Sequence, residues 1–211
     1  MRGRLLVAIW AVFVGFGCHN RTSDNGNKTA SNTPIENSKI QESKTTIALS
    51  RFKKNREYIA EGFDFPVGKP NAEGYYNAQK FQENNHLGDD WNGTGGGNSD
   101  LGDTIYSIAN GYISEVKDYG GGWGLVVRVV HLYKDKLYES VYAHCDSIMA
   151  KQGDFVKKGL AIATIGNNNG QYYAHLHLEI RTDITLGIGP GYSTNTEGYL
   201  DPTEFIKSNR H

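Results

Sequence analysis

The stretch Tyr173-Ala174-His175-Leu176-His177-Leu178-Glu179-Ile180 alternates polar and apolar side chains from His175 onward. A period of two is typical of a β-strand with one face in a core, so the Leu and Ile side chains are expected to point inward and His175, His177 and Glu179 to the other face. Two imidazoles on one strand face can act on a single centre, one as a metal ligand and the other in proton transfer. The alternative is a solvent-exposed face with two unrelated histidines. Glu179 is interpreted as a solvated carboxylate, with a hydrogen bond to an imidazole N–H as the alternative.

Further short apolar or alternating runs, separated by glycine-rich turns, surround this stretch. Regularly spaced short strands predict a mainly β fold, an antiparallel sheet arranged as a sandwich or barrel. Helices are expected only as short segments at residues 51–61 and 202–207, and no internal repeat of solenoid length is evident. The expected strands are Thr104–Ala109, Gly111–Val116, Gly124–Leu132, Leu137–His144, Leu160–Ile165 and Ala174–Arg181.

The chain begins with the order of a secretory signal. Two arginines precede the apolar run Leu5–Phe16, and Gly17 and Cys18 follow it. The run is shorter than the roughly 20 apolar residues that span a bilayer, so residues 1–17 are predicted to be a cleaved signal and not a transmembrane anchor. The Gly-Cys junction resembles a bacterial lipoprotein signal, in which Cys18 is lipidated and begins the mature chain. Secretion without lipidation is the alternative.

The segment behind the signal has the composition of a linker. Residues 18–50 are rich in Asn, Ser, Thr and Lys and have few large apolar side chains. They bury too little surface to offset the entropy of ordering, so we predict a flexible tether. The remaining residues, 51–211, have the size of one domain. A domain tethered to a lipid at Cys18 is expected in the cell envelope, on the periplasmic or extracellular face of a membrane.

Charge and cysteine content restrict the function classes. The chain has 22 basic and 23 acidic residues, so nothing indicates a nucleic-acid partner. If Cys18 is lipidated, Cys145 has no disulfide partner, and stability is expected to come from a core and a bound metal. A catalytic thiol at Cys145 beside His144 is disfavoured, because adjacent residues on a strand point to opposite faces.

A second segment carries candidate metal ligands. His86 and Asp90 are separated by Gly88 and followed by a glycine-rich stretch, which favours a loop or a strand end over a helix. With one histidine of the 175–177 pair they would offer two nitrogens and one oxygen. This set suits zinc with an open fourth position, whereas calcium prefers six or more oxygens.

A third segment, Val141-Tyr142-Ala143-His144, also alternates. Its period of two places Tyr142 and His144 on one face, which we expect to be the face that carries the histidine pair. His131 occurs in a similar apolar context and is interpreted as structural.

Together, the segments His86-Leu87-Gly88-Asp89-Asp90, Tyr142-Ala143-His144 and His175-Leu176-His177 resemble the HxGxD, YAH and HLH motifs of the LytM and lysostaphin-type zinc metallopeptidases, the M23 family. The connecting segments at residues 102–111 and 153–166 also resemble that family. The resemblance covers about residues 63–202, and three ordered motifs are far more specific than any single pair.

The resemblance implies a role for each matching position. His86, Asp90 and His177 match zinc ligands, and His144 and His175 match catalytic histidines. The implied fold is the LytM-type antiparallel β-sheet, related to the duplicated hybrid motif, with a substrate groove over one face. The implied activity is that of a metalloendopeptidase with one Zn²⁺ ion, which hydrolyses peptides of bacterial peptidoglycan by metal-activated water assisted by the two histidines.

Two other functions fit parts of the pattern. Some proteins with this fold have lost ligands and regulate cell-wall hydrolases without catalysis, but all five positions are present here. A sugar-transport phosphocarrier also uses paired histidines, but the signal segment and Asp90 argue against it.

The chain departs from the family pattern in three places. Residues 89–103 carry an additional acid, Asp89, and a long Gly/Asn run, interpreted as a flexible flap at the groove or a disordered surface loop. Tyr172 and Tyr173 are bulkier than the small-residue turn usual in the family, which bears on the shape of the groove and the choice of substrate. Tyr75 and Tyr76 are candidates for a tyrosine that often precedes the first motif in the family.

Overall fold

The computed structural model describes residues 34–210. The predicted signal, Cys18 and the first part of the predicted tether lie outside this range. Within it, no helix has both the length and the apolar character needed to cross a membrane.

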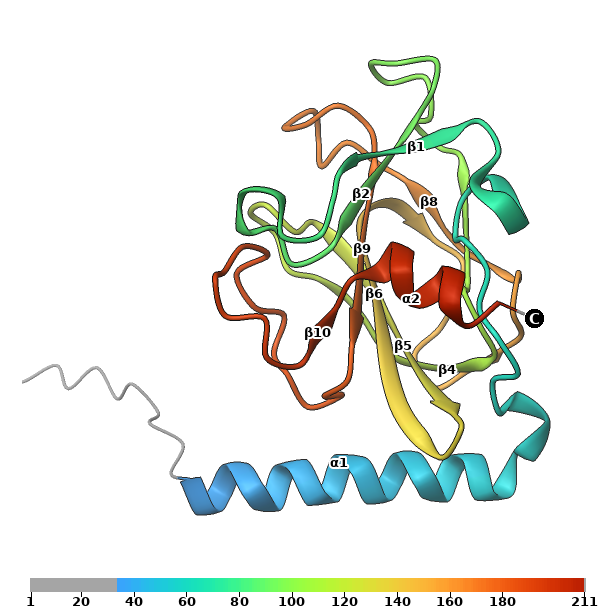
Figure 1. Ribbon diagram of the computed structural model, residues 1–211, viewed down its shortest axis with the longest axis vertical. Helices are drawn as coiled ribbons and strands as arrows, with labels where there is room; N and C mark the ends of the chain where they lie inside the picture. Colours follow the sequence, from blue (N-terminus) through green and yellow to red (C-terminus); the bar gives the residue numbers. More distant parts are fainter. Residues whose placement is uncertain (1–33, 211) are drawn as a thin grey trace, which may run out of the picture. The chain divides into compact units, whose positions relative to one another are not determined.

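The described residues form a mainly β fold, as the alternation of short runs predicts (Figure 1). All strand pairs are antiparallel, and the sheet has the order β1-β2-β9-β6-β5-β4-β7. Off this path, β10 pairs with β9, and β8 pairs with both β3 and β6. The strands are β1 (Tyr75–Gln79), β2 (Asp89–Gly93), β3 (Thr104–Tyr106), β4 (Gly111–Asp118), β5 (Leu125–Tyr133), β6 (Lys136–Ile148), β7 (Phe155–Val156), β8 (Ala161–Ile165), β9 (Leu176–Arg181) and β10 (Tyr199–Leu200).

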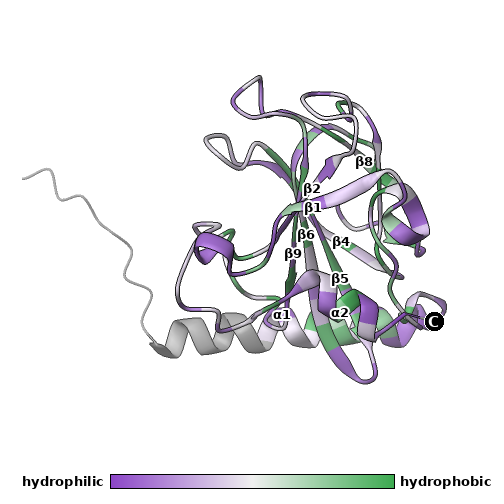
Figure 2. Cartoon of the chain, turned by 45° about the horizontal axis from the view of Figure 1, so that its top comes forward, coloured by the Kyte–Doolittle hydropathy of each residue, from purple (hydrophilic) through white to green (hydrophobic). Residues whose placement is uncertain are grey.

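One face of β9 forms the centre of the main core. Leu176, Leu178 and Ile180 are buried in a single apolar cluster, and each contributes about 1.5–3 kcal/mol by leaving water. Figure 2 shows the apolar colouring gathered on the central strands and the polar colouring on the surrounding loops. The predicted C-terminal helix is present as α2 (Pro202–Ser208), which contributes Ile206 to the same cluster.

The N-terminal helix corrects two predictions. Residues 34–50, expected in a flexible tether, belong to α1 (Pro34–Lys54), and the short helix expected at 51–61 is only the end of this longer one. The segment is helical although its sequence is mostly polar, because a few apolar residues fall on one face of the helix. Ala48 and Phe52, one helical turn apart, are fully buried in a second apolar cluster with residues of the sheet. The compact unit therefore begins at Pro34.

His131 lies in the core, in a continuous chain of hydrogen bonds. Its Nδ1 contacts the carbonyl oxygen of Asn110 at 2.8 Å, and a carbonyl can only accept, so Nδ1 carries the hydrogen. Nε2 then accepts from Ser140 Oγ at 2.7 Å, and Ser140 Oγ lies 3.0 Å from the Tyr142 hydroxyl. The hydroxyl also accepts from the Ile108 N–H. This arrangement requires a neutral imidazole, and burial lowers the pKa of His131 to about 4.

Protonation of His131 is expected to make the fold acid-sensitive. The unfolded chain takes up a proton near the ordinary pKa of 6.5, whereas the folded chain does so near 4. The neutral His131 thus makes its full contribution to the free energy of unfolding above pH 6.5. This contribution is lost as the pH falls to about 4, and the loss amounts to at most about 3 kcal/mol. Denaturant unfolding measured across this range tests it. A His131→Gln variant should lose this part of the pH dependence, and an unchanged profile in the variant would contradict the assignment.

Candidate functional site

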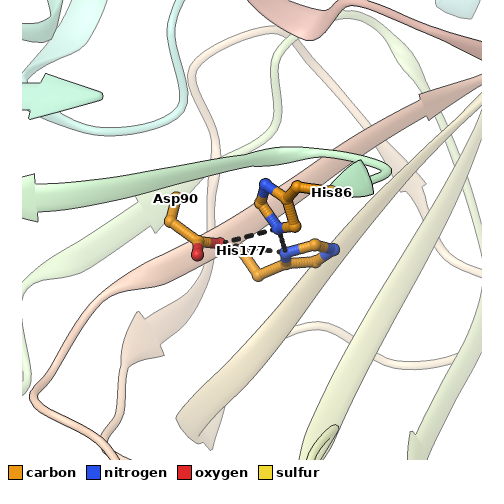
Figure 3. Close-up of side chains that lie close together, drawn as sticks. All are labelled: His86, Asp90 and His177. Atoms are coloured by element: carbon orange, nitrogen blue, oxygen red, sulfur yellow. Dashed lines mark hydrogen bonds and ion pairs between the residues drawn. The ribbon is translucent and has the colours of Figure 1, made fainter. Parts of the chain in front are cut away.

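Three polar side chains from two distant parts of the sequence meet on the face of β9 that points away from the main core (Figure 3). His86 Nε2 lies 2.9 Å from His177 Nδ1, and Asp90 Oδ1 lies 3.3 Å from the former and 3.0 Å from the latter. Asp90 on β2 and His177 on β9 are direct cross-strand partners, which brings their side chains together. His86 precedes β2 in a loop, in agreement with the expected loop or strand end.

Gly88 permits this close approach. A Cβ atom at this position would lie 2.4 Å from the carbonyl oxygen of Leu178 and 2.9 Å from Cε1 of His177. Any side chain at Gly88 would therefore push β2 away from β9. The glycine in the middle of the His86–Asp90 segment is needed for contact between the strands.

Behind His177 lies a chain of buried charges. Glu179 Oε1 is 3.2 Å from His177 Nε2, and Arg181 forms an ion pair of 2.5 Å with Glu179. The Arg181 guanidinium also donates to the carbonyl oxygens of Gly187 and Ile188 in the β9–β10 loop. The interpretation of Glu179 as a solvated carboxylate is thus wrong: the side chain is 0% exposed and lies between His177 and Arg181. The alternative, a hydrogen bond to an imidazole, is the one that the structure shows.

These carboxylates set the protonation of the cluster. Burial disfavours a charge on His177, but hydrogen bonds and charges from Asp90 and Glu179 outweigh it and raise the pKa of His177 to about 9. Burial likewise opposes ionisation of Asp90, but hydrogen bonds to His177 and His86 hold the pKa of Asp90 far below its ordinary value. A positive charge is therefore favoured between the two acids.

The three atoms also fit a divalent metal ion. Four ligands placed tetrahedrally at about 2.0–2.1 Å from zinc are about 3.3 Å apart, and the three distances here are 2.9, 3.0 and 3.3 Å. Two imidazole nitrogens and one carboxylate oxygen are a donor set found in catalytic zinc sites. The hydrogen bond between His177 Nε2 and Glu179 would orient the ligating ring.

His144 reaches the same face through an irregularity that the alternation does not reveal. Ala143 pairs with His177 and Tyr142 with Leu178, so Tyr142 points into the core and Ala143 to the side of the cluster. The prediction that Tyr142 shares the face of His144 is thus wrong. His144 has φ 58, and the register between β5 and β6 shifts here, so two successive residues of β6 lie on the same face.

The two remaining histidines flank the cluster. The His144 ring centre lies 4.7 Å from that of His175 and 5.7 Å from that of His177. Burial, together with repulsion from the two other imidazoles, lowers the pKa of His144 to about 3, so its ring is neutral. His175 Nδ1 lies 2.7 Å from the carbonyl oxygen of Tyr173, to which it donates. Nε2 of His175 lies on the other side of the ring, 4.0 Å from Asp90 Oδ1.

A half-open pocket of about 400 Å³ surrounds these groups. Its walls carry three aromatic side chains that sequence reasoning did not select as site residues: Trp123, Tyr172 and Tyr192. The Trp123 ring lies 5.3 Å from that of His177, and the Tyr192 ring 5.1 Å from that of His86. Tyr172 was marked in the sequence as bulkier than the usual turn of the family, whereas Trp123 and Tyr192 have no signal beyond a neighbouring glycine in a predicted loop.

Four other residues that the sequence analysis considered do not belong to the histidine cluster. Asp89 accepts hydrogen bonds from Thr203 and from the Phe81 N–H, away from the cluster. Cys145 lies in the core, where burial raises the pKa of its thiol to about 12. Neither Tyr75 nor Tyr76 lines the pocket.

The Gly/Asn run after Asp90 is held as a surface loop. Asp100 accepts the N–H of Gly93, which ends β2, at 2.8 Å. Asn98 accepts the N–H of Ala174 at 2.8 Å, directly before the histidine pair. The segment is thus a surface loop with fixed contacts, and neither the flexible flap nor the disordered loop describes it.

Comparison with known proteins gives consistent matches. The model of Peptidase family M23 matches residues 90–188. Lipoprotein NlpD of Yersinia enterocolitica is 34% identical over 80 residues, which are 38% of this chain and 78% of that protein. An uncharacterized metalloprotease of Haemophilus influenzae is 36% identical over 78 residues, 37% of this chain but only 16% of its own length.

A solved structure shares the fold. A chain of the SpoIIQ-SpoIIIAH pore forming complex has a TM-score of 0.52 and 22% identity, with 69% of this chain and 91% of that chain covered. At this identity the likeness concerns the fold alone.

Proposed function

Because the chain belongs to peptidase family M23, we propose that it is a zinc-dependent endopeptidase that hydrolyses peptide bonds in bacterial peptidoglycan. One observation carries the proposal: five side chains from three separate motifs converge around one pocket. His86, Asp90 and His177 are the proposed zinc ligands, and His144 and His175 the proposed catalytic residues.

The proposed ligands assign a chemistry to the centre. A zinc ion held by these three side chains would polarise a peptide carbonyl group and lower the pKa of a water molecule. Asp90 supplies the negative charge that favours a cation, and Glu179 accepts the Nε2 hydrogen of His177 so that Nδ1 stays free to bind.

The two flanking histidines have different tasks in this proposal. His175 has its Nδ1 hydrogen fixed on the Tyr173 carbonyl, so its Nε2 is the atom able to accept a proton from water. His144 is neutral, and a neutral imidazole can donate a hydrogen bond to the oxygen of the carbonyl group as negative charge develops there.

We place the protein in the cell envelope, held at a membrane by a lipid on Cys18. The signal-like N-terminus and the likeness to a protein called Lipoprotein NlpD support this location. Peptidoglycan peptides are then within reach.

The alternative is a regulator of cell-wall hydrolases with no peptidase activity of its own. Such a protein has no need of a complete set of ligands and flanking histidines. The convergence of all five side chains favours the enzyme.

A His144→Asn variant should separate binding of the metal from turnover. Asparagine tolerates positive φ, so the bulge is kept, and the three proposed ligands are untouched. We expect full zinc content and a rate reduced by about 10²–10³-fold, because the shorter asparagine side chain does not reach the position of the imidazole nitrogen and the proposed hydrogen bond to the carbonyl oxygen is lost. Zinc analysis together with the hydrolysis assay checks this. Unchanged turnover would exclude His144 from catalysis.

The proposed function is tested by digestion of purified peptidoglycan with the zinc-loaded protein, with products identified by mass spectrometry. Peptide-bond cleavage that depends on zinc supports the enzyme, and the new termini identify the bond. If zinc binds with a stoichiometry of one and no product forms, the regulatory alternative is correct.

A further inference from the structure

The β9–β10 loop, residues 182–198, is flexible by composition where it borders the pocket. Its segment 187–191 reads Gly-Ile-Gly-Pro-Gly, and glycine loses more conformational freedom on ordering than any other residue. Gly189 and Gly191 have φ 78 and 77, a region that favours glycine. Apolar packing comes from Ile188, which is partly buried against a small apolar cluster on the sheet. Hydrogen bonds therefore have to supply much of the order of this segment.

Two buried arginines bind the first half of the loop. Arg128 Nη2 donates to the carbonyl oxygen of Leu186 at 2.7 Å. Arg181 donates to the next two carbonyl oxygens, those of Gly187 and Ile188, at 2.7 and 2.6 Å. Three consecutive carbonyl groups are thus held by arginines that are at most 5% exposed, and hydrogen bonds from a charged donor are stronger than those between neutral groups.

The second half of the loop pairs with the segment that precedes β2. The N–H of Leu87 donates to the carbonyl oxygen of Gly191 at 2.9 Å. The N–H of Ser193 donates to the carbonyl oxygen of Asn85 at 2.7 Å. Tyr192 lies between these two bonds and lines the pocket. The position of this pocket wall therefore depends on how the whole loop is held.

Arg128 lies on β5, outside the pocket, and is itself fixed by two carboxylates. Its Nη2 lies 2.6 Å from Glu139 Oε2, and its Nη1 lies 3.2 Å from Glu115 Oε2. A buried ion pair adds little net stability, because desolvation offsets the attraction between the charges. The planar guanidinium can, however, bind two carboxylates and a carbonyl oxygen at once in a fixed geometry. The contact with the Leu186 carbonyl thus places the loop relative to the sheet.

We infer that Arg128 is a positioning residue that fixes the β9–β10 loop and, through this loop, the Tyr192 wall of the pocket. The effect on substrate rests on the proposed function, whereas the effect on the loop does not. When one of its contacts is lost, the glycine-rich loop occupies its present position for a smaller fraction of the time. The apparent affinity for a substrate that needs the wall falls in proportion to that fraction.

The test compares Arg128→Lys with the wild type in the presence of zinc. Lysine keeps the charge beside Glu139, but a single ammonium nitrogen cannot take the positions of both guanidinium nitrogens. Arg210→Lys is the matched control, because Arg210 also donates to a backbone carbonyl oxygen, that of Pro70, outside the β9–β10 loop. The first readout is amide hydrogen exchange, measured residue by residue by NMR, at the N–H groups of Leu87 and Ser193.

In Arg128→Lys, exchange at these two amides is expected to be faster by about tenfold, because the loop opens locally. Amides of the β3–β8 pair, which the loop does not contact through these bonds, should exchange as in the wild type. Adding Gly187→Ala should recover about two- to fivefold of the lost protection, since alanine reduces the freedom of the open loop. A Cβ at this position meets no atom within 4 Å.

The second readout is hydrolysis of a cross-linked muropeptide dimer. We expect KM to rise by about tenfold in Arg128→Lys, with kcat within about threefold of the wild type, because the loop reaches its position before the chemical step. Zinc content should be unchanged, since none of the proposed ligands is altered. A purely structural role of Arg128 would not separate KM from kcat in this way.

Wild-type exchange at both amides in Arg128→Lys overturns the inference, and so does faster exchange that includes the β3–β8 pair to the same degree. Selectively faster exchange with an unchanged KM overturns the link to the pocket wall. Selectively faster exchange in a protein that hydrolyses nothing supports the fixing of the loop and overturns the proposed enzyme.

A milder variant keeps the test decisive if Arg128→Lys does not fold. Glu115→Gln removes one of the two carboxylates that hold the guanidinium, and this side chain is 30% exposed, so an amide is tolerated there. Exchange at Leu87 and Ser193 should then be faster by about twofold, with the β3–β8 pair unchanged. Wild-type exchange in Glu115→Gln, together with an unfolded Arg128→Lys, would show that Arg128 only supports the fold and would overturn the inference.

Discussion

The Asp90→Asn variant is expected to lose zinc and, with it, all measurable peptidoglycan hydrolysis. Asparagine has the same shape as aspartate but no charge, and Asp90 Oδ1 lies 3.0 Å from His177 and 3.3 Å from His86. Without the carboxylate, only two imidazole ligands remain, and the anion that would contact the cation directly is lost. Removal of a residue that only hydrogen-bonds to a metal ligand lowers the metal affinity by about 10–100-fold. Removal of a ligand itself should therefore lower the affinity by more than about 100-fold.

The measurement is the zinc dissociation constant, obtained by competition with a chelator, together with product release from peptidoglycan. The matched control is Asp135→Asn, the same chemical change in the exposed β5–β6 turn, where φ 62 suits asparagine. The control should bind zinc as the wild type does. Wild-type affinity in Asp90→Asn would remove Asp90 from the metal centre.

The Gly88→Ala variant should damage the fold and the site together. The new Cβ would lie 2.4 Å from a backbone oxygen of β9, a distance that forces the two strands apart. The β2–β9 pair then loses its register, and Asp90 and His177, which are cross-strand partners, separate. We expect a loss of about 3 kcal/mol in the free energy of unfolding and loss of stoichiometric zinc binding.

Denaturant unfolding and zinc titration of the purified variant test this expectation. Gly187→Ala is a suitable control, because a Cβ at that position meets no atom within 4 Å. Gly187 lies in the β9–β10 loop, and its carbonyl oxygen can still accept from Arg181 in the control. A midpoint of unfolding equal to that of the wild type in Gly88→Ala would show that the strands adjust without cost.

The proposed site depends on loops as much as on the sheet. Asp90, His144 and His177 lie on β2, β6 and β9, whereas His86 precedes β2 and His175 precedes β9. The β9–β10 loop holds Arg181, which forms an ion pair with Glu179.

Local pattern was sufficient for six of the strands and for the faces of β9, but it did not predict β1, β2, β7 or β10. Side chains alternate strictly along an extended chain, so the core residues Leu176, Leu178 and Ile180 and the opposite face with His175 and His177 follow from the order of residues alone. The interruption of the His86–Asp90 segment by glycine likewise indicated a loop, because glycine is unfavourable inside a helix.

Local pattern failed for the N-terminal helix. Its polar composition conceals the two positions, Ala48 and Phe52, that become fully buried, and burial on the sheet supplies stability that the segment lacks by itself.

The sequence by itself determined the mainly β class, six of the strand segments and the identities of the five polar side chains, because period and motif are local properties. Only the tertiary structure decided how the five side chains are positioned and what surrounds them. The bulge at His144 depends on pairing with β5, the ion pair behind His177 on a loop that holds Arg181, and the shape of the pocket on contacts between loop residues more than 40 positions apart. These are long-range contacts, and no local alternation of residues encodes them.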